Sequence, residues 1–318
     1  MICPRSATFT SEGVALTYLT TEVDPTQDTA TLTAYSIWPA SFTLASLLLS
    51  APALCTGHTV VELGAGISCL PSLAALAAGA ACVLATDCEA AVLPHALSSL
   101  QAACARTASA AAHTALLHWQ SPAHLAAVTA AHGANTFRLG LASDVLWLRS
   151  LAVTEPLAAQ ATALLACAQQ LLVGWGGSSS SSSSSSPPAC TQACGHLLLA
   201  FQRRSGDLLT ALQLACASTG TQCAFLAPPA QPPQGEGSSA AAPVLLALLC
   251  PCQPCLQRAL AASRRQQLLP TPTPSQLERE EEAYVQGVLA QRGRGAAGAQ
   301  PATLHGNPLF TRSLLPRG

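Results

Sequence analysis

Residues 60–71 read Val-Val-Glu-Leu-Gly-Ala-Gly-Ile-Ser-Cys-Leu-Pro, and this stretch decides the fold. An apolar run typical of a buried strand enters a loop that contains Gly64 and Gly66, and an Ala/Leu-rich segment typical of a helix follows. The two glycines allow the backbone to turn tightly and to approach a ligand closely. The stretch therefore predicts a strand–loop–helix unit with a ligand site at the loop.

Strand-like and helix-like segments alternate on both sides of this stretch. Short continuous apolar runs are typical of parallel strands that are buried on both faces, so the pattern predicts an α/β fold with helices on both faces of the sheet. The predicted strands cover residues 59–63, 82–86, 114–118, 137–142, 196–201, 223–226 and 243–249. The predicted helices cover a stretch that ends at Leu49 and residues 70–78, 89–104, 155–172 and 207–217.

The N-terminal part predicts an additional element, a β-hairpin. Residues 13–20 and 31–37 are β-prone runs, and the turn-rich residues 24–28 lie between them. We therefore expect these two runs to pair with each other.

The domain organisation follows from changes in composition. We expect a short N-terminal segment at residues 1–12, one domain at 13–255 and a mostly disordered tail at 256–318. Nine consecutive serines lie within residues 174–195, which we interpret as a flexible surface insertion because such a tract buries no apolar area.

The composition of the 318 residues limits the classes of function. Charged residues make up 9% of the chain, against about 25% in an average soluble domain. The 14 basic residues, all arginines, are balanced by 15 acidic ones, which argues against a nucleic-acid partner bound by a broad basic surface. The chain has no apolar run of about 18 residues, so we expect no membrane partner.

The cysteines and the N-terminus indicate a compartment. The chain begins without the apolar segment of a signal peptide, and its 14 cysteines lie in apolar surroundings. These features indicate buried thiols in a reducing environment, so we expect a cytoplasmic monomer, with a nuclear or organellar location left open.

The residues around the glycine loop indicate the charge of the ligand. A dinucleotide site would have a third glycine where Cys69 stands, and Glu62 adds a carboxylate that repels a pyrophosphate. The pattern favours a positively charged ligand without phosphates. Asp87 ends the second predicted strand, where an acidic residue hydrogen-bonds ribose hydroxyls in doubly wound folds.

Aromatic and acidic side chains follow the later strands. Trp119 comes just after the third predicted strand, and Ser143, Asp144 and Trp147 follow the fourth, while Trp38 precedes the first predicted helix. Because the carboxyl ends of parallel strands form the ligand crevice, we expect these side chains to meet there.

The ordered set of these motifs resembles methyltransferase family 16 over about residues 13–250. The set begins with Trp-Pro-Ala-Ser at 38–41 and Glu-Leu-Gly-Ala-Gly at 62–66, and it continues with Ala-Thr-Asp at 85–87, His-Trp at 118–119 and Ser-Asp-x-x-Trp at 143–147. The segment 198–204 is also similar to the fifth-strand segment of that family. The resemblance implies a Rossmann-like, seven-β-strand class I sheet and a methyltransferase that uses S-adenosylmethionine, many members of the family being protein-lysine methyltransferases.

The resemblance also implies roles for individual residues. The cofactor-binding residues would be Trp38, Glu62, Gly64, Ala65, Gly66, Asp87, Trp119 and Ser143. Asp144 and Trp147 would be catalytic, matching an Asp-x-x-Tyr motif near the acceptor in which this chain has Trp in place of Tyr. The implied partner is a protein substrate that accepts the methyl group on a lysine. Aromatic walls suit this chemistry because their faces attract a sulfonium or ammonium cation.

Two other functions stay open at this point. One is a methyltransferase-like scaffold that binds the cofactor or a partner without turnover. The other is an NAD(P)-dependent oxidoreductase, against which Cys69 and Glu62 weigh.

A metal site is not expected. The run Cys-Pro-Cys-Gln-Pro-Cys at 250–255 offers thiols, but a closed zinc site needs four ligands, usually in two pairs, and no second pair lies close in sequence.

Overall fold

The computed structural model describes residues 4–21, 33–106, 110–146, 157–175, 194–202, 206–229 and 244–263. A seven-stranded sheet with the order β5-β4-β3-β6-β7-β9-β8 forms the centre of the fold. The strands are β3 (Thr59–Leu63), β4 (Cys82–Asp87), β5 (Ala111–Leu116), β6 (Leu139–Ser143), β7 (His196–Gln202), β8 (Gln222–Leu226) and β9 (Val244–Cys250). Strands β3 to β7 pair in parallel, and β9 pairs antiparallel with both β7 and β8.

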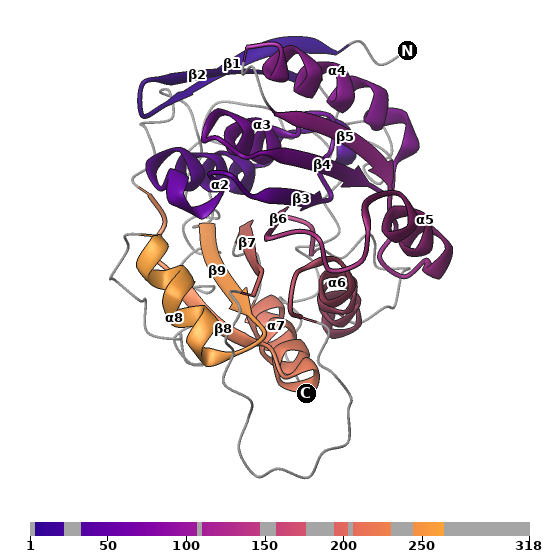
Figure 1. The fold of residues 1–318 in the computed structure, drawn as a ribbon, viewed down its shortest axis with the longest axis vertical. Coiled ribbons are helices and arrows are strands. Elements are labelled where there is room, and N and C mark those ends of the chain that lie inside the picture. Colours follow the sequence, from indigo (N-terminus) through magenta and orange to yellow (C-terminus); the bar gives the residue numbers. More distant parts are fainter. Residues whose placement is uncertain are drawn as a thin grey trace, which may run out of the picture.

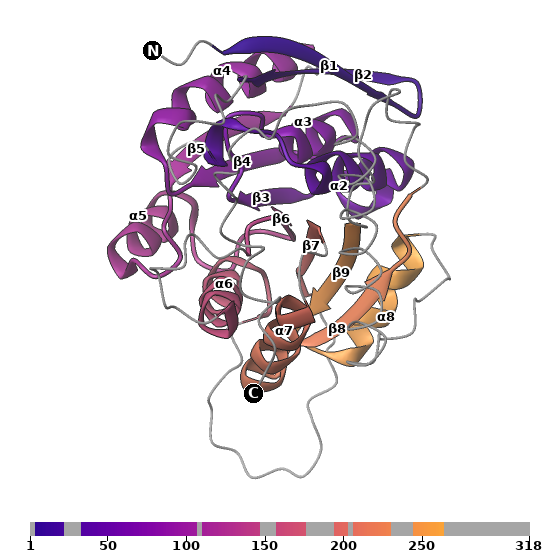
Figure 2. The same cartoon turned by 180° about the vertical axis from the view of Figure 1, so that it is seen from behind.

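Helices cover both faces of this sheet (Figures 1 and 2). One face packs against α2 (Pro39–Ser50), α3 (Leu70–Ala77), α4 (Leu93–Cys104) and α8 (Gln253–Ala262). The other face packs against α5 (Pro122–His132), α6 (Leu157–Leu171) and α7 (Gly206–Thr219). Short 3-10 turns are η1 (Thr33–Tyr35), η2 (Pro52–Leu54) and η3 (Ala90–Val92). The predicted α/β sheet with helices on both faces is thus confirmed.

The order of the strands explains where a ligand can bind. The chain moves outward from β3 to β4 and β5 and then returns to the other side of β3 with β6. Loops therefore diverge between β3 and β6, and a crevice opens at the carboxyl ends of these two strands. The loop with Gly64 and Gly66 follows β3 at this switch point, and Ser143 ends β6.

The N-terminal hairpin exists, but the predicted partner of residues 13–20 is wrong. Strand β1 (Arg5–Ser11) pairs antiparallel with β2 (Val14–Thr20) through a two-residue turn. Glu12 and Gly13 both have a positive φ, 50° and 74°, as a type I′ turn requires. In the segment predicted as the second strand, residues 33–35 form η1 instead. The hairpin lies over the helices of the α2–α4 face (Figure 1) and adds Phe9, Leu16 and Tyr18 to the core.

Other boundaries also differ from the prediction. The third predicted strand starts three residues earlier and ends two residues earlier, since β5 aligns Leu116 with Asp87 and leaves residues 118 and 119 in the loop. Helix α8 continues past residue 255, and Leu256 and Ala259 are buried against the sheet.

Some predicted features lie outside the described residues. These are the serine tract at 178–186, the tail from residue 264 onward and Trp147. Within the ranges that are described, no helix is both long enough and apolar enough to cross a membrane.

Candidate functional site

A cavity of about 360 Å³ lies at the carboxyl ends of strands β3 to β6, and we call it the strand-end cavity. Its volume is within the range of small-molecule sites. Most of the residues singled out in the sequence line it, namely Trp38, Gly64, Ala65, Gly66, Asp87, Trp119, Ser143 and Asp144. The topology therefore brings together side chains that are more than 100 residues apart in sequence, such as Trp38 and Ser143.

The glycine loop forms one wall of the cavity. Gly64 and Gly66 have φ values of 79° and 58°, which L side chains rarely adopt. A Cβ on Gly64 would lie 2.6 Å from a methyl carbon of Val145, and one on Gly66 would lie 2.8 Å from the carbonyl oxygen of Ala34. Both positions therefore need glycine for the turn and for the close approach of the neighbouring segments.

Asp87 ties the glycine loop to the end of β4. Its Oδ2 accepts a hydrogen bond from the backbone N–H of Gly66 at 2.8 Å, and its Oδ1 accepts one from Glu89 at 2.9 Å. The side chain is only 5% exposed, and burial raises the pKa of Asp87 although these N–H donors oppose the rise. The carboxylate thus stands at the cavity in a fixed orientation.

The two described tryptophans of the site stand at different edges of the cavity. Trp38 precedes α2, and its indole N–H donates to the carbonyl of Thr33 at 3.2 Å. Trp119 follows β5, and its ring lies 3.9 Å from the position that a Cβ on Gly64 would take. The cavity is therefore bounded by aromatic rings from two distant segments.

Residues 143 and 144 connect the end of β6 to its neighbours. The hydroxyl oxygens of Ser143 and Ser41 are hydrogen-bonded at 2.9 Å, which joins β6 to α2. Asp144 has a φ of 56°, and its Oδ1 accepts from the backbone N–H of Gln202 at 3.1 Å. Asp144 thus lines the cavity and also holds the end of β7, a second role that the sequence does not reveal.

Glu62 is the one described residue of the predicted set that does not line the cavity. Its side chain is fully buried, and its Oε2 accepts from both the backbone N–H and the hydroxyl of Ser72 in α3. Its Oε1 has no hydrogen-bond partner among the described residues. Burial, with a smaller contribution from Asp87, raises the pKa of Glu62 to about 8. Glu62 therefore joins β3 to α3, the two elements on either side of the glycine loop, as a protonated acid at neutral pH.

This burial leads to a prediction about pH and stability. The folded chain keeps the Glu62 proton up to about pH 8, whereas the unfolded chain releases it near its ordinary pKa of 4.5. Between these values the folded state binds more protons, so the free energy of unfolding decreases as the pH rises, by up to about 1.4 kcal/mol per pH unit. We expect Glu62→Gln, which stays neutral and still accepts from Ser72, to flatten this decrease. Urea unfolding of both proteins from about pH 5 to about pH 9 measures the difference, and parallel curves would contradict it.

The structure also adds cavity residues that the sequence analysis missed. They are Thr33, Ala34, Ser36, Ser41, Ser68, Cys88, Glu89, Leu117, His118, Gln120, Val145 and Gln160. Glu89 had a usable signal, since it follows Asp87 by two residues in the same strand-end loop. Gln160 had none, because it lies in the first turn of α6 and reaches the cavity only through the packing of that helix.

The charge of the lining distinguishes between ligand classes. Three carboxylates, those of Asp87, Glu89 and Asp144, line the cavity, and no arginine is among the lining residues described. Such a lining suits a ligand with cationic groups and repels a pyrophosphate. The cavity thus disfavours a dinucleotide.

Comparisons with known proteins gave distant structural similarities and one family match. No curated protein matches the chain. Among solved structures, a protein from Streptococcus mutans described as an S-adenosylmethionine-dependent methyltransferase is similar at 9% identity with a TM-score of 0.48, over 78% of this chain and 56% of that one. The chain thus spans just over half the length of that structure. A ribosomal protein L11 methylase from Lactobacillus delbrueckii subsp. bulgaricus is similar at 15% identity with a TM-score of 0.37, over 65% of this chain and 77% of that one.

A family model supplies the assignment. The model, described as lysine methyltransferase, matches residues 20–183, which is about half of the chain and includes every predicted site residue. The chain therefore belongs to methyltransferase family 16, and its cofactor is S-adenosylmethionine.

Proposed function

We propose that this protein transfers a methyl group from S-adenosylmethionine to the side-chain amine of a lysine in a protein substrate. The observation that carries the proposal is the acidic, aromatic strand-end cavity, with carboxylates from β4 and β6 and tryptophans from two other segments. A lysine side chain arrives as a cationic ammonium group. The carboxylates that line the cavity attract this cation before the ammonium group loses its proton. The name of the family model supports the same acceptor.

The residues of the cavity fit the cofactor. Asp87 offers carboxylate oxygens at the end of β4, where ribose hydroxyls bind in doubly wound folds. The glycine loop brings backbone close to the ligand, and the faces of Trp38 and Trp119 suit a cationic sulfonium. When bound, S-adenosylmethionine supplies an activated methyl group.

The chain's own contribution to the reaction is alignment and exclusion of water. Methyl transfer is an in-line displacement, so holding the acceptor nitrogen in line contributes most of the rate. The backbone N–H of Asp144 donates to the carbonyl of Ala200, and its carboxylate accepts from the backbone N–H of Gln202. Asp144 is therefore a hydrogen-bond acceptor in a fixed position for an incoming amine. The half-buried ring of Trp119 shields the same space from water.

Transfer of labelled methyl groups tests the proposal. The purified chain is incubated with S-adenosylmethionine carrying a deuterated methyl group and with a lysate of undermethylated proteins, and labelled peptides are located by mass spectrometry. We expect the label on lysine side chains. A matched control is Gly66→Val, which blocks the loop with a side chain that meets Ala34 and should abolish labelling. Label on another residue type would contradict the lysine acceptor, and an active chain that labels only small molecules would contradict the protein substrate.

A further inference from the structure

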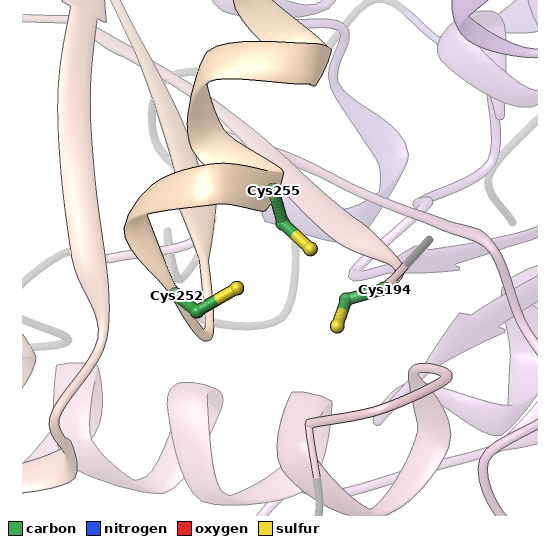
Figure 3. A group of neighbouring side chains, drawn as sticks. All are labelled: Cys194, Cys252 and Cys255. Atoms are coloured by element: carbon green, nitrogen blue, oxygen red, sulfur yellow. The ribbon is translucent and has the colours of Figure 1, made fainter. Parts of the chain in front are cut away.

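Three cysteines that are far apart in the sequence come together beside α8. Cys194 lies two residues before the start of β7. Cys252 and Cys255 lie at the N-terminal end of α8. Their Sγ atoms all lie within 4.8 Å of one another. Figure 3 shows the three side chains directed into one common space between α8 and the start of β7. None of the three lines the strand-end cavity, so the cluster is separate from the methyltransferase site.

The start of α8 places two of the thiols. Cys252 is the N-cap residue, and a proline follows at the first turn, which fixes where the helix begins. A spacing of three residues brings the side chains of Cys252 and Cys255 to the same side of this turn. The positive end of the helix dipole favours thiolates at such positions, and the guanidinium of Arg258 donates to Sγ of Cys255 at 3.0 Å.

The third thiol is held in place by the segment after α6. The backbone N–H of Gly195 donates to the carbonyl of Val173 at 2.7 Å, and the indole N–H of Trp175 donates to the carbonyl of Gly195 at 2.7 Å. Gly174 has a φ of 70°, and a Cβ there would lie 2.9 Å from Sγ of Cys194. Gly174 therefore packs directly against the side chain of Cys194 and restricts the positions that its thiol can take.

We propose that Cys194, Cys252 and Cys255 bind a zinc ion that fastens α8 to the start of β7. A disulfide needs two thiols, whereas three mutually close thiols suit a thiophilic cation. Zinc–sulfur bonds of about 2.3 Å in a tetrahedral site place the sulfur atoms about 3.8 Å apart. Small side-chain movements therefore bring the three Sγ atoms to the distances that zinc requires. Binding releases the thiol protons.

Charge and exposure fit this ion. Three thiolates around Zn²⁺ leave a net charge of −1, which the guanidinium of Arg258 offsets. Cys255 is buried, while Cys194 and Cys252 are half-buried, so the cluster has one side toward solvent. The fourth position can thus take water or another ligand from that side. The spacing of the cysteines in the sequence predicts no metal site. The reason is that Cys194 comes close to Cys252 and Cys255 only because β7 pairs with β9.

The first test is metal content and spectroscopy of the chain of residues 1–318. The protein is purified in the presence of Zn²⁺, and zinc is measured by mass spectrometry. We expect about one zinc ion for each chain, and we expect Co²⁺ in its place to give thiolate-to-cobalt charge-transfer absorption. This absorption needs no variant, so it tests the proposal even if substitutions prevent folding.

Variants assign the ligands. Cys252→Ser should lose most of the zinc and the charge-transfer absorption, whereas Cys104→Ser, a half-buried cysteine at the end of α4, should keep both. A chelator should lower the melting temperature of the unmodified chain and of Cys104→Ser, but not that of Cys252→Ser. A zinc-free chain, cobalt bound without thiolate absorption or a disulfide between Cys252 and Cys255 would each overturn the proposal.

Discussion

Replacement of Asp87 by alanine should weaken S-adenosylmethionine binding by roughly tenfold to 150-fold, because a hydrogen bond to a charged acceptor contributes about 1.5–3 kcal/mol. The variant removes the carboxylate that stands at the cavity and at the same time releases the N–H of Gly66 that it holds at 2.8 Å. Both losses act on the cofactor, the first directly and the second through the glycine loop. Isothermal titration of the purified variant with S-adenosylmethionine measures the change in Kd.

A second variant separates the two losses. Asp87→Asn keeps an oxygen that can accept from Gly66 but has no negative charge for the ribose hydroxyls. We expect its affinity to lie between those of the wild type and Asp87→Ala. If a folded Asp87→Ala protein binds S-adenosylmethionine with wild-type affinity, Asp87 does not contact the cofactor. If only Asp87→Asn keeps wild-type affinity, the charge of Asp87 does not contribute to binding, and the residue acts only by holding the glycine loop.

The central part of the fold could be predicted from the sequence because its signals are local. Strand β3 coincides with the predicted 59–63, and α3 begins at the predicted Leu70. Strands β3 and β4 are short apolar runs, of which one ends before a glycine and the other at an acidic residue, and both kinds of residue are visible in one window of sequence. The same local signals identified eight of the twenty residues that line the cavity.

The N-terminal hairpin shows how a local signal can be misread. The sequence pattern predicts Gly13 as the first residue of a strand, whereas Glu12 and Gly13 form the turn between β1 and β2. The turn-rich residues 24–28 give a competing turn signal nearby, and a positive φ such as that of Glu12 is uncommon for a residue other than glycine. The sequence analysis predicts no helix at α5, although Ser121 caps it and Gly133 ends it, which are recognised start and stop signals.

The environments of Glu62 and Cys194 depend on packing that the sequence does not display. A strand in a covered sheet is buried on both faces, so its apolar pattern does not show which helix each side chain meets. Glu62 therefore looked like a ligand of the cavity, whereas it meets Ser72 in α3. Contacts of Cys194 with α8 need the complete order of strands β7, β9 and β8, which no local window contains.

The largest effect on turnover should come from Asp144. We expect Asp144→Asn to lower methyl transfer by about 100-fold or more while S-adenosylmethionine still binds, because a carboxylate at the acceptor side holds the incoming amine in line for the displacement. Asn is the matched replacement, since it can still accept from Gln202 and it tolerates the φ of 56° at this position. Single-turnover methyl transfer to an identified substrate, beside titration with the cofactor, measures the two properties separately.

Asp144→Ala distinguishes catalysis from support of the sheet. Alanine leaves the N–H of Gln202 without its acceptor, so this variant should also unfold more easily, by about 1–3 kcal/mol, whereas Asp144→Asn should keep nearly wild-type stability. If Asp144→Asn keeps wild-type turnover, the carboxylate has no role toward the acceptor and its function is to hold β7. If Asp144→Asn loses cofactor binding and turnover together, Asp144 contacts the cofactor instead of the amine, and the acceptor must approach from the side of Trp119.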